Sequence, residues 1–214
     1  MIDMTLTEQL KEFAENSVKR HPGAAQDIMK NAISALKNTD ILENAIKTGD
    51  QFPDFKLPNA KGAHIALSNL LKEGKVVLTF YRGGWCPYCN IALKALQNAL
   101  PEIKAKGASL VAITPETPDN TLSTRDKNEL DFEVLTSENN GLARSLGLVY
   151  QLPESLVSLY KKFGIDLIES QGNEASELPI AATYIIEQNG KVSYHFLAED
   201  YKLRADPLAV ISAL

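Results

Sequence analysis

Two cysteines, the only ones in the chain, stand three residues apart in Trp85-Cys86-Pro87-Tyr88-Cys89. A pair at this spacing can cycle between two thiols and a disulfide, supply half of a structural zinc site, or fill the core as small apolar residues. Zinc would need two further ligands, and the three histidines are not paired at a ligand spacing. The pair therefore indicates thiol redox chemistry ahead of a metal site or a structural role, and it calls for no cofactor.

The cysteine pair follows a predicted buried strand and begins a predicted helix. With Cys86 at the helix cap, Pro87 takes the first helical position, where its missing N–H costs nothing. Unpaired N–H groups and the positive end of the helix dipole then stabilise a thiolate on Cys86, and Arg82 adds a positive charge. We therefore predict Cys86 as the nucleophile and Cys89, one turn further in, as its disulfide partner.

The loop between strand and helix is expected to form the substrate pocket. Two glycines after Arg82 allow a sharp turn and a close approach of substrate to the sulfur. The aromatic residues beside the cysteines would flank that sulfur with apolar surface. The predicted pocket residues are Tyr81, Gly83, Gly84, Trp85, Pro87 and Tyr88.

The elements that must position this loop follow an alternating order. Strands are predicted at residues 76–81, 109–114, 132–135, 182–186 and 191–197, and helices at residues 87–106, 118–129, 140–146, 153–163 and 207–214. The Asn-Gly turn at residues 189–190 is a strong signal for a hairpin between the last two strands. This order predicts an α/β fold, with a mixed central sheet flanked by helices on both faces.

The first 47 residues differ from the rest because they are predicted to be entirely helical. Leu6, Leu10, Phe13 and Val18 recur at near-helical spacing in the first of these helices. We therefore expect an N-terminal helical extension, residues 1–47, before a single domain, residues 48–214.

The composition excludes several function classes. The chain has 214 residues, 44% of them apolar and 23% charged, and a formal net charge of −5. A mildly acidic chain without a basic block is a poor binder of nucleic acid or anionic lipid. No apolar run approaches the roughly 20 residues that span a bilayer, and the polar N-terminus lacks the apolar region of a signal peptide. We therefore expect no nucleic-acid or membrane partner and a cytoplasmic location.

The segment Phe80-Tyr81-Arg82-Gly83-Gly84-Trp85-Cys86-Pro87-Tyr88-Cys89-Asn90 resembles the active-site segment of the alkyl hydroperoxide reductase and thiol-specific antioxidant (AhpC/TSA) group, the peroxiredoxin-like branch of the thioredoxin fold. The likeness runs from the lead-in at residues 49–55 through the stretch at residues 113–116 to the hairpin at residues 183–197, about three quarters of the chain. The resemblance implies a thioredoxin-like fold and Cys86 as the cysteine that attacks peroxide. It also implies an external thiol reductant, such as thioredoxin or glutathione, and a homodimer.

The chain departs from this family's pattern at three places. Typical members carry Pro seven residues and Thr or Ser three residues before the reactive cysteine, where this chain has Thr79 and Gly83. They also carry an Arg at the start of the late strand, where this chain has none in residues 180–183. We predict that Arg82 replaces the missing Arg, and that Thr79 and Thr183 provide polar groups in the pocket.

Two other functions remain open on the sequence. Cys-Pro-Tyr-Cys matches the glutaredoxin motif, so the protein could instead be a thiol–disulfide oxidoreductase acting on protein or glutathione disulfides. Such enzymes carry a proline beside the active site, a position that Pro179 would have to fill. A third hypothesis is a redox sensor whose N-terminal helices bind a partner.

Overall fold

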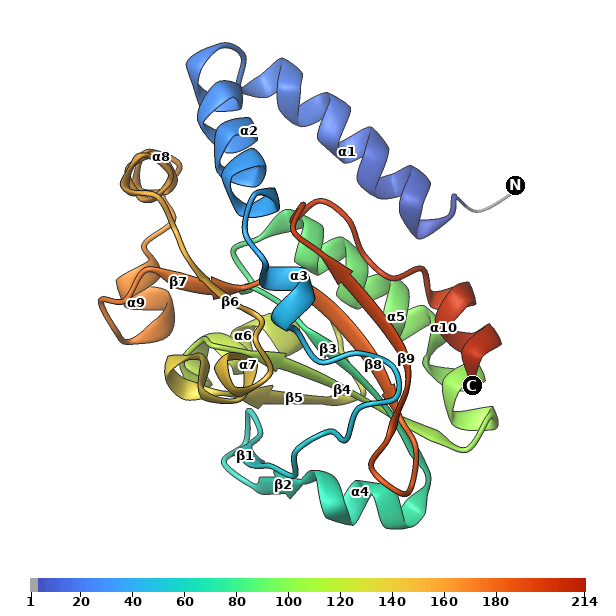
Figure 1. The fold of residues 1–214 in the computed structure, drawn as a ribbon. Helices are drawn as coiled ribbons and strands as arrows, with labels where there is room; N and C mark the ends of the chain where they lie inside the picture. The colour runs from blue at the N-terminus through green and yellow to red at the C-terminus, as the bar shows by residue number, and fades with distance from the viewer. Residues whose placement is uncertain (1–3) are drawn as a thin grey trace.

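The computed structural model describes residues 4–214 and contains a five-stranded mixed sheet (Figure 1). Its strands are β3 (Lys75–Phe80), β4 (Ala108–Thr114), β5 (Glu133–Thr136), β8 (Ala181–Ile186) and β9 (Val192–Ala198), in the order β5-β4-β3-β8-β9. β3, β4 and β5 run parallel, while β8 is antiparallel to both β3 and β9. The predicted α/β architecture is confirmed. β3 is the central strand, which explains its unbroken apolar run.

Helices cover both faces of this sheet (Figure 1). One face packs against α1 (Leu6–Arg20), α5 (Pro87–Ala105) and α10 (Pro207–Ala213), and the other against α3 (Ile41–Asn44), α4 (Leu67–Glu73) and α7 (Gly141–Ser145). α6 (Pro118–Lys127) lies beside β5. The active-site helix α5 therefore begins at the carboxyl edge of β3, where ligands collect in open α/β sheets.

The N-terminal helices pack into the same cores as the rest of the chain. α1 begins with a capping box between Thr5 and Glu8, and it buries Leu6 and Leu10 against α5. Val18 recurs with these residues at near-helical spacing in the sequence but is 52% exposed. The helix turns by 100° per residue, and Val18 therefore lies off the stripe that the two leucines define.

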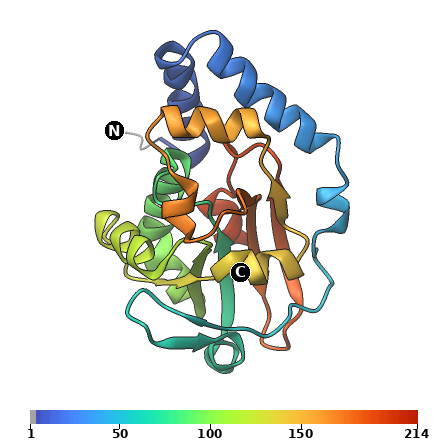
Figure 2. The ribbon, with the colours of Figure 1, turned by 90° about the vertical axis from the view of Figure 1, so that its left-hand side faces the viewer.

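α2 (Ala24–Lys37) and α8 (Glu154–Lys162) pack together through a smaller core that contains Met29 and Leu156. Figures 1 and 2 show α1, α2 and α8 at the same end of the molecule, the end at which α5 begins.

The short elements of the fold were not predictable from pattern. Two antiparallel pairs flank the main sheet, β1 (Lys56–Pro58) with β2 (His64–Ala66) and β6 (Val149–Gln151) with β7 (Glu177–Pro179). The remaining elements are α9 (Leu167–Gln171) and a single 3-10 turn, η1 (Glu138–Asn140). Three residues are too few to display a strand's alternation or a helix's period. Within residues 4–214, no helix has the length and apolarity that a membrane crossing requires.

Candidate active site

Cys86 occupies the N-cap of α5, as predicted, and Pro87 is the first helical residue. The carbonyl of Cys86 accepts hydrogen bonds from the backbone N–H groups of Cys89 at 3.0 Å and Asn90 at 3.2 Å, which closes the first turn. Both sulfur-bearing residues are buried, Cys86 with 1% and Cys89 with 0% of its surface exposed. They are present as free thiols, one helical turn apart.

Arg204 is the cation that touches the pair. Its Nη2 lies 3.1 Å from Cys89 Sγ, while its Nη1 donates to the backbone carbonyls of Tyr201 and Leu203, both at 2.6 Å. The residue lies in the loop between β9 and α10. The end of β9 pairs with the start of β8, with Ala198 opposite Ala181, so this loop returns to the carboxyl edge of β3. No local sequence motif predicts the role of Arg204. It is 115 residues from Cys89 in the sequence and comes close to it only through the β8–β9 hairpin.

The two thiols differ in acidity. Burial opposes ionisation of Cys89, but the hydrogen bond from Cys86 and the charges of Arg204 and Arg82 bring the pKa of Cys89 well below its ordinary value. Burial and the hydrogen bond to Cys89 raise the pKa of Cys86, against the smaller opposing effect of the two arginines. Ionisation is therefore favoured at Cys89, next to Arg204, over Cys86.

Arg82 is fully buried among aromatic rings. Its guanidinium carbon lies 4.6 Å from the ring centre of Tyr201, 4.9 Å from that of Trp85 and 5.5 Å from that of Tyr160. Nη2 donates a hydrogen bond to the Tyr160 hydroxyl. Nε has no hydrogen-bond partner in the described part of the chain. A buried guanidinium with an unused donor can bind an oxygen that arrives with a ligand.

A cavity of about 480 Å³ opens onto Cys86. It is lined by Phe13, Ser17, Arg20, His21 and Met29 from the N-terminal helices, by Arg82, Trp85, Cys86, Pro87 and Tyr88 from the cysteine segment, and by Tyr160, Lys162, Phe163, Ile165 and Tyr201. Three of the six predicted pocket residues therefore line this cavity, and three do not. That residues of α1 and α2 line this cavity was not predicted from the sequence.

Of the predicted pocket residues, the structure gathers Trp85, Pro87 and Tyr88 around this cavity. Tyr81 directly follows β3 and is buried. It donates its backbone N–H to the Ile113 carbonyl at 2.9 Å. It does not line the cavity, because it still belongs to the packed end of the β3 strand.

The two glycines serve packing rather than substrate approach. A Cβ on Gly83 would lie 2.2 Å from Trp85 Nε1 and 2.9 Å from a Glu116 oxygen. A Cβ on Gly84 would lie 1.9 Å from the Thr124 hydroxyl. Neither glycine is among the residues that line the cavity at Cys86. Because the two glycines have no side chains, Trp85, Glu116 and Thr124 can pack closely against their backbone.

Thr79 and Thr183 are likewise not part of the cavity lining. The β3–β8 register sets them directly opposite each other, and their hydroxyls lie 3.0 Å apart. Thr79 also donates to the carbonyl of Ala182 at 3.3 Å. The two hydroxyls therefore satisfy each other inside the sheet.

Glu116 is a buried acid behind the cysteine loop that the sequence pattern does not single out as buried. Its carboxylate accepts hydrogen bonds from the Gly84 N–H at 2.9 Å, the Ser170 hydroxyl at 3.1 Å and the Thr124 hydroxyl at 3.4 Å. Burial raises the pKa of Glu116, partly offset by these hydrogen bonds. Glu116 therefore anchors the loop that precedes Cys86 from the side opposite the cavity.

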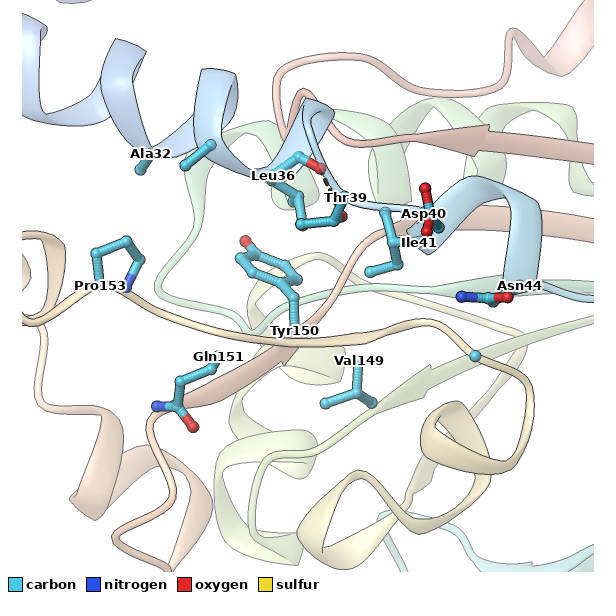
Figure 3. A pocket seen from close by; sticks show the side chains of 12 residues that line it. Ala32, Leu36, Thr39, Asp40, Ile41, Asn44, Val149, Tyr150, Gln151 and Pro153 are labelled. Atoms are coloured by element: carbon cyan, nitrogen blue, oxygen red, sulfur yellow. Dashed lines mark hydrogen bonds between the residues drawn. The ribbon is translucent and has the colours of Figure 1, made fainter.

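A second cavity, of about 600 Å³, lies between the end of α2, α3 and β6 (Figure 3). Tyr150 projects into it between Leu36 and Pro153, and Thr39 donates to the Leu36 carbonyl at 2.7 Å. Burial raises the pKa of Tyr150 to about 12, so the ring stays neutral. Asp40 is the one charged residue in its lining, which contains no cysteine.

The described residues offer no cluster of side chains that would suit a metal ion. Among residues 4–214, no group of three or more His, Cys, Asp or Glu side chains could hold a metal ion.

Comparison with known proteins identifies the family. The model of the AhpC/TSA family matches residues 48–195. The chain belongs to the AhpC/TSA family. The match begins where the predicted extension ends, so the two helices that line the cavity at Cys86 stand outside the family segment.

Individual relatives carry the same indication. The chain is 26% identical over 105 residues to peroxiredoxin Bcp of Escherichia coli, which covers 49% of this chain and 67% of that protein. It is 28% identical over 145 residues to a putative peroxiredoxin bcp of Helicobacter pylori, covering 68% and 84%.

The fold has solved counterparts. Peroxidoxin BcpB of Mycobacterium tuberculosis superposes with a TM-score of 0.62 at 22% identity, over 78% of this chain and 96% of that one. The bacterioferritin comigratory protein of Xanthomonas campestris gives 0.57 at 14% identity, over 79% and 94%. At these identities the likeness shows the thioredoxin-type fold of the peroxiredoxins.

Proposed function

We propose that this protein is a thiol-dependent peroxidase that reduces hydrogen peroxide or alkyl hydroperoxides. The observation that carries the proposal is Cys86 at the N-cap of α5, on the wall of a cavity, with Cys89 one turn behind it against Arg204. Family membership and the peroxiredoxin names of the relatives support it.

In this mechanism Cys86 is the nucleophile and Cys89 its base. As Cys86 Sγ attacks one peroxide oxygen, its proton passes to the Cys89 thiolate, the O–O bond breaks, and the leaving alkoxide takes a proton from solvent. The products are a Cys86 sulfenic acid and an alcohol, or water from hydrogen peroxide. Cys89 then attacks Cys86 Sγ, the disulfide forms, and hydroxide leaves as water.

Arg82 supports the peroxide in place of the missing Thr and Arg. Arg82 lines the same cavity as Cys86, and its buried Nε donor has no partner among the described residues. A hydrogen bond from a buried guanidinium to the peroxide oxygen stabilises the negative charge that develops as the O–O bond breaks. Thr79 and Thr183 contribute at most through the sheet beneath the site, since they bond to each other.

An external thiol returns the disulfide to the dithiol. A reducing cytoplasm, the proposed location, keeps both thiols reduced between turnovers. We also propose that residues 1–47 form an N-terminal helical extension to a domain of residues 48–214, and that the protein is a homodimer. Sedimentation of the purified protein at several concentrations tests the dimer.

Trp85, the only tryptophan, reports the first step because it adjoins Cys86. Its ring lies 5.5 Å from that of Tyr160 and against Arg82, so oxidation of the sulfur changes its fluorescence. Rapid mixing of reduced protein with hydrogen peroxide is expected to give a fluorescence change orders of magnitude faster than oxidation of a free thiol. Cys86→Ser should abolish it, and Cys89→Ser should stop the reaction at the Cys86 sulfenic acid, which dimedone traps.

The thiol–disulfide oxidoreductase alternative makes an opposite prediction in the same assay. It expects a rate with peroxide no greater than that of a simple thiol, together with rapid reduction of insulin disulfides. Pro179, the proline on which that alternative relies, pairs with Val149 in the β6–β7 sheet and does not line the cavity at Cys86.

A further inference from the structure

We propose that the thiol that regenerates the enzyme is a small anionic thiol of the glutathione class, which enters the cavity at Cys86, rather than a protein such as thioredoxin. The proposal rests on the proposed function only in taking the Cys86–Cys89 disulfide as the form to be reduced.

The first argument is steric. A reductant must bring its sulfur onto Cys86 or Cys89, and these residues are 1% and 0% exposed. α1, its C-cap and α2 supply five of the cavity-lining residues. These N-terminal residues are attached to the rest of the protein by direct contacts. Phe13 stacks edge-on against Tyr88 with ring centres 5.1 Å apart, and the Tyr201 hydroxyl donates to Met29 Sδ at 3.3 Å. A small molecule can enter a cavity of about 480 Å³, whereas a folded protein needs the sulfur at its surface.

The second argument is charge. The cavity lining carries Arg20, Arg82 and Lys162 and no carboxylate, in a chain whose net charge is −5. Arg20 and Lys162 are exposed at its outer part, while Arg82 is buried beside Cys86. Clustering of positive charge in a cleft raises the local concentration of anions. The second cavity offers no such attraction, because Asp40 is its one charged residue.

The chemistry of the cavity fixes which sulfur is attacked. Cys86 lines the cavity, and Cys89 faces Arg204 at 3.1 Å. A glutathione thiolate attacks Cys86 Sγ, the disulfide bond breaks, and Cys89 leaves as a thiolate next to the guanidinium. A second glutathione attacks the glutathione sulfur of the mixed disulfide and releases the Cys86 thiol. The net change is one protein disulfide and two thiols to one protein dithiol and oxidised glutathione.

The experiment starts from full-length protein whose disulfide is formed with diamide, so that it does not depend on peroxidase activity. Re-reduction is followed by Trp85 fluorescence with glutathione, with glutathione diethyl ester, and with thioredoxin at equal thiol concentration. The ester has the same thiol without the carboxylate charges. Glutathione is expected to react faster than its ester, and thioredoxin slowest.

Arg20→Gln and Lys162→Gln test the cationic rim. Each is expected to lower the ratio of the glutathione rate to the ester rate by about threefold, the size of one partly screened charge pair. A change in packing alone would lower both rates together and leave the ratio unchanged. Lys19→Gln and Lys161→Gln are matched controls, since each removes a neighbouring exposed charge that does not line the cavity.

Faster reduction by thioredoxin than by glutathione overturns the proposal, as does a rate ratio that neither rim variant changes. Failure of the proposed function would look different, because the reduced protein would then not react with peroxide while the diamide-formed disulfide still discriminates between thiols.

Discussion

Two arginines from distant parts of the chain lie at the two cysteines, Arg204 at Cys89 and Arg82 at the cavity with Cys86. Arg82 was accessible to sequence reasoning because it is four residues from Cys86. Arg204 was not, since a lone arginine in a polar loop has no distinguishing pattern until the β8–β9 hairpin places it.

Loss of Arg204 is expected to change the acidity of the pair. In Arg204→Met, Cys89 loses the nearest positive charge, so its pKa rises and the thiolate forms only at higher pH. The ultraviolet absorbance of the thiolate, followed as pH increases, should shift toward higher pH in the variant. Peroxide oxidation at neutral pH should slow with it.

Lys202→Met is the control, since Lys202 pairs with Asp200 at 3.6 Å in the same loop. Titration curves that coincide for wild type and Arg204→Met would contradict the assignment.

Glu116 is expected to make stability depend on pH. Because burial raises its pKa, the folded protein keeps this proton at pH values at which the unfolded chain has released it. The free energy of unfolding therefore falls as pH rises from the ordinary carboxyl pKa to the raised one, and is level above it. Glu116→Gln, which still offers an oxygen to the Gly84 N–H, should flatten this decline in urea unfolding measured across pH.

Glu169→Gln provides the comparison, because Glu169 is exposed near the same part of the surface. Parallel curves for wild type and Glu116→Gln would show that the buried carboxyl does not titrate in this window.

At the scale of elements, the cysteine loop is held from both sides. Its backbone is tied to Glu116 through Gly84, and Asn90 Nδ2 donates to the Gly84 carbonyl at 2.8 Å. The strand, the capped helix and the hairpin could be predicted because each has a periodic or turn signal. The tightness of the loop could not, since it depends on Thr124 and Glu116, which approach from other elements.

Restoring the family's threonine at residue 83 is expected to damage the site. In Gly83→Thr the new Cβ would collide with the Trp85 ring and the Glu116 carboxylate, which has few ways to move. We expect a loss of stability of about 1–3 kcal/mol and an altered Trp85 emission, without a gain in peroxidase rate. Denaturant unfolding and fluorescence spectra measure both effects.

Gly141→Ala is the matched glycine control. Its φ of −53° is helical and no atom lies within 4 Å of the added Cβ, so its stability should match or slightly exceed wild type. A Gly83→Thr variant of normal stability and increased peroxide rate would contradict the packing account.

At the scale of the whole molecule, the N-terminal helices and the family segment share one core. Leu10 is 5% exposed and packs with residues of α5 and the sheet. The sequence indicated a helical extension but not its docking site, because an amphipathic stripe shows that a helix is partnered and not where.

Leu10→Ala tests whether the N-terminal helices and the family segment share one core. The cavity left under α1 is expected to lower the free energy of unfolding by about 2–5 kcal/mol. Helix content by circular dichroism and Trp85 fluorescence should be lost in one shared transition, since a common core unfolds cooperatively.

Val18→Ala, at an exposed position of the same helix, should have little effect. Separate transitions for the two probes in wild type would mean that the extension folds independently.

The residues that build the site are spread over nearly the whole polypeptide, from Phe13 to Arg204. During synthesis the cysteine pair leaves the ribosome more than a hundred residues before Arg204 does. Until the β8–β9 hairpin closes, neither the sheet that buries the sulfurs nor the cation beside Cys89 exists. The nascent chain therefore carries two ordinary thiols, and it acquires its special reactivity toward oxidants only on completion.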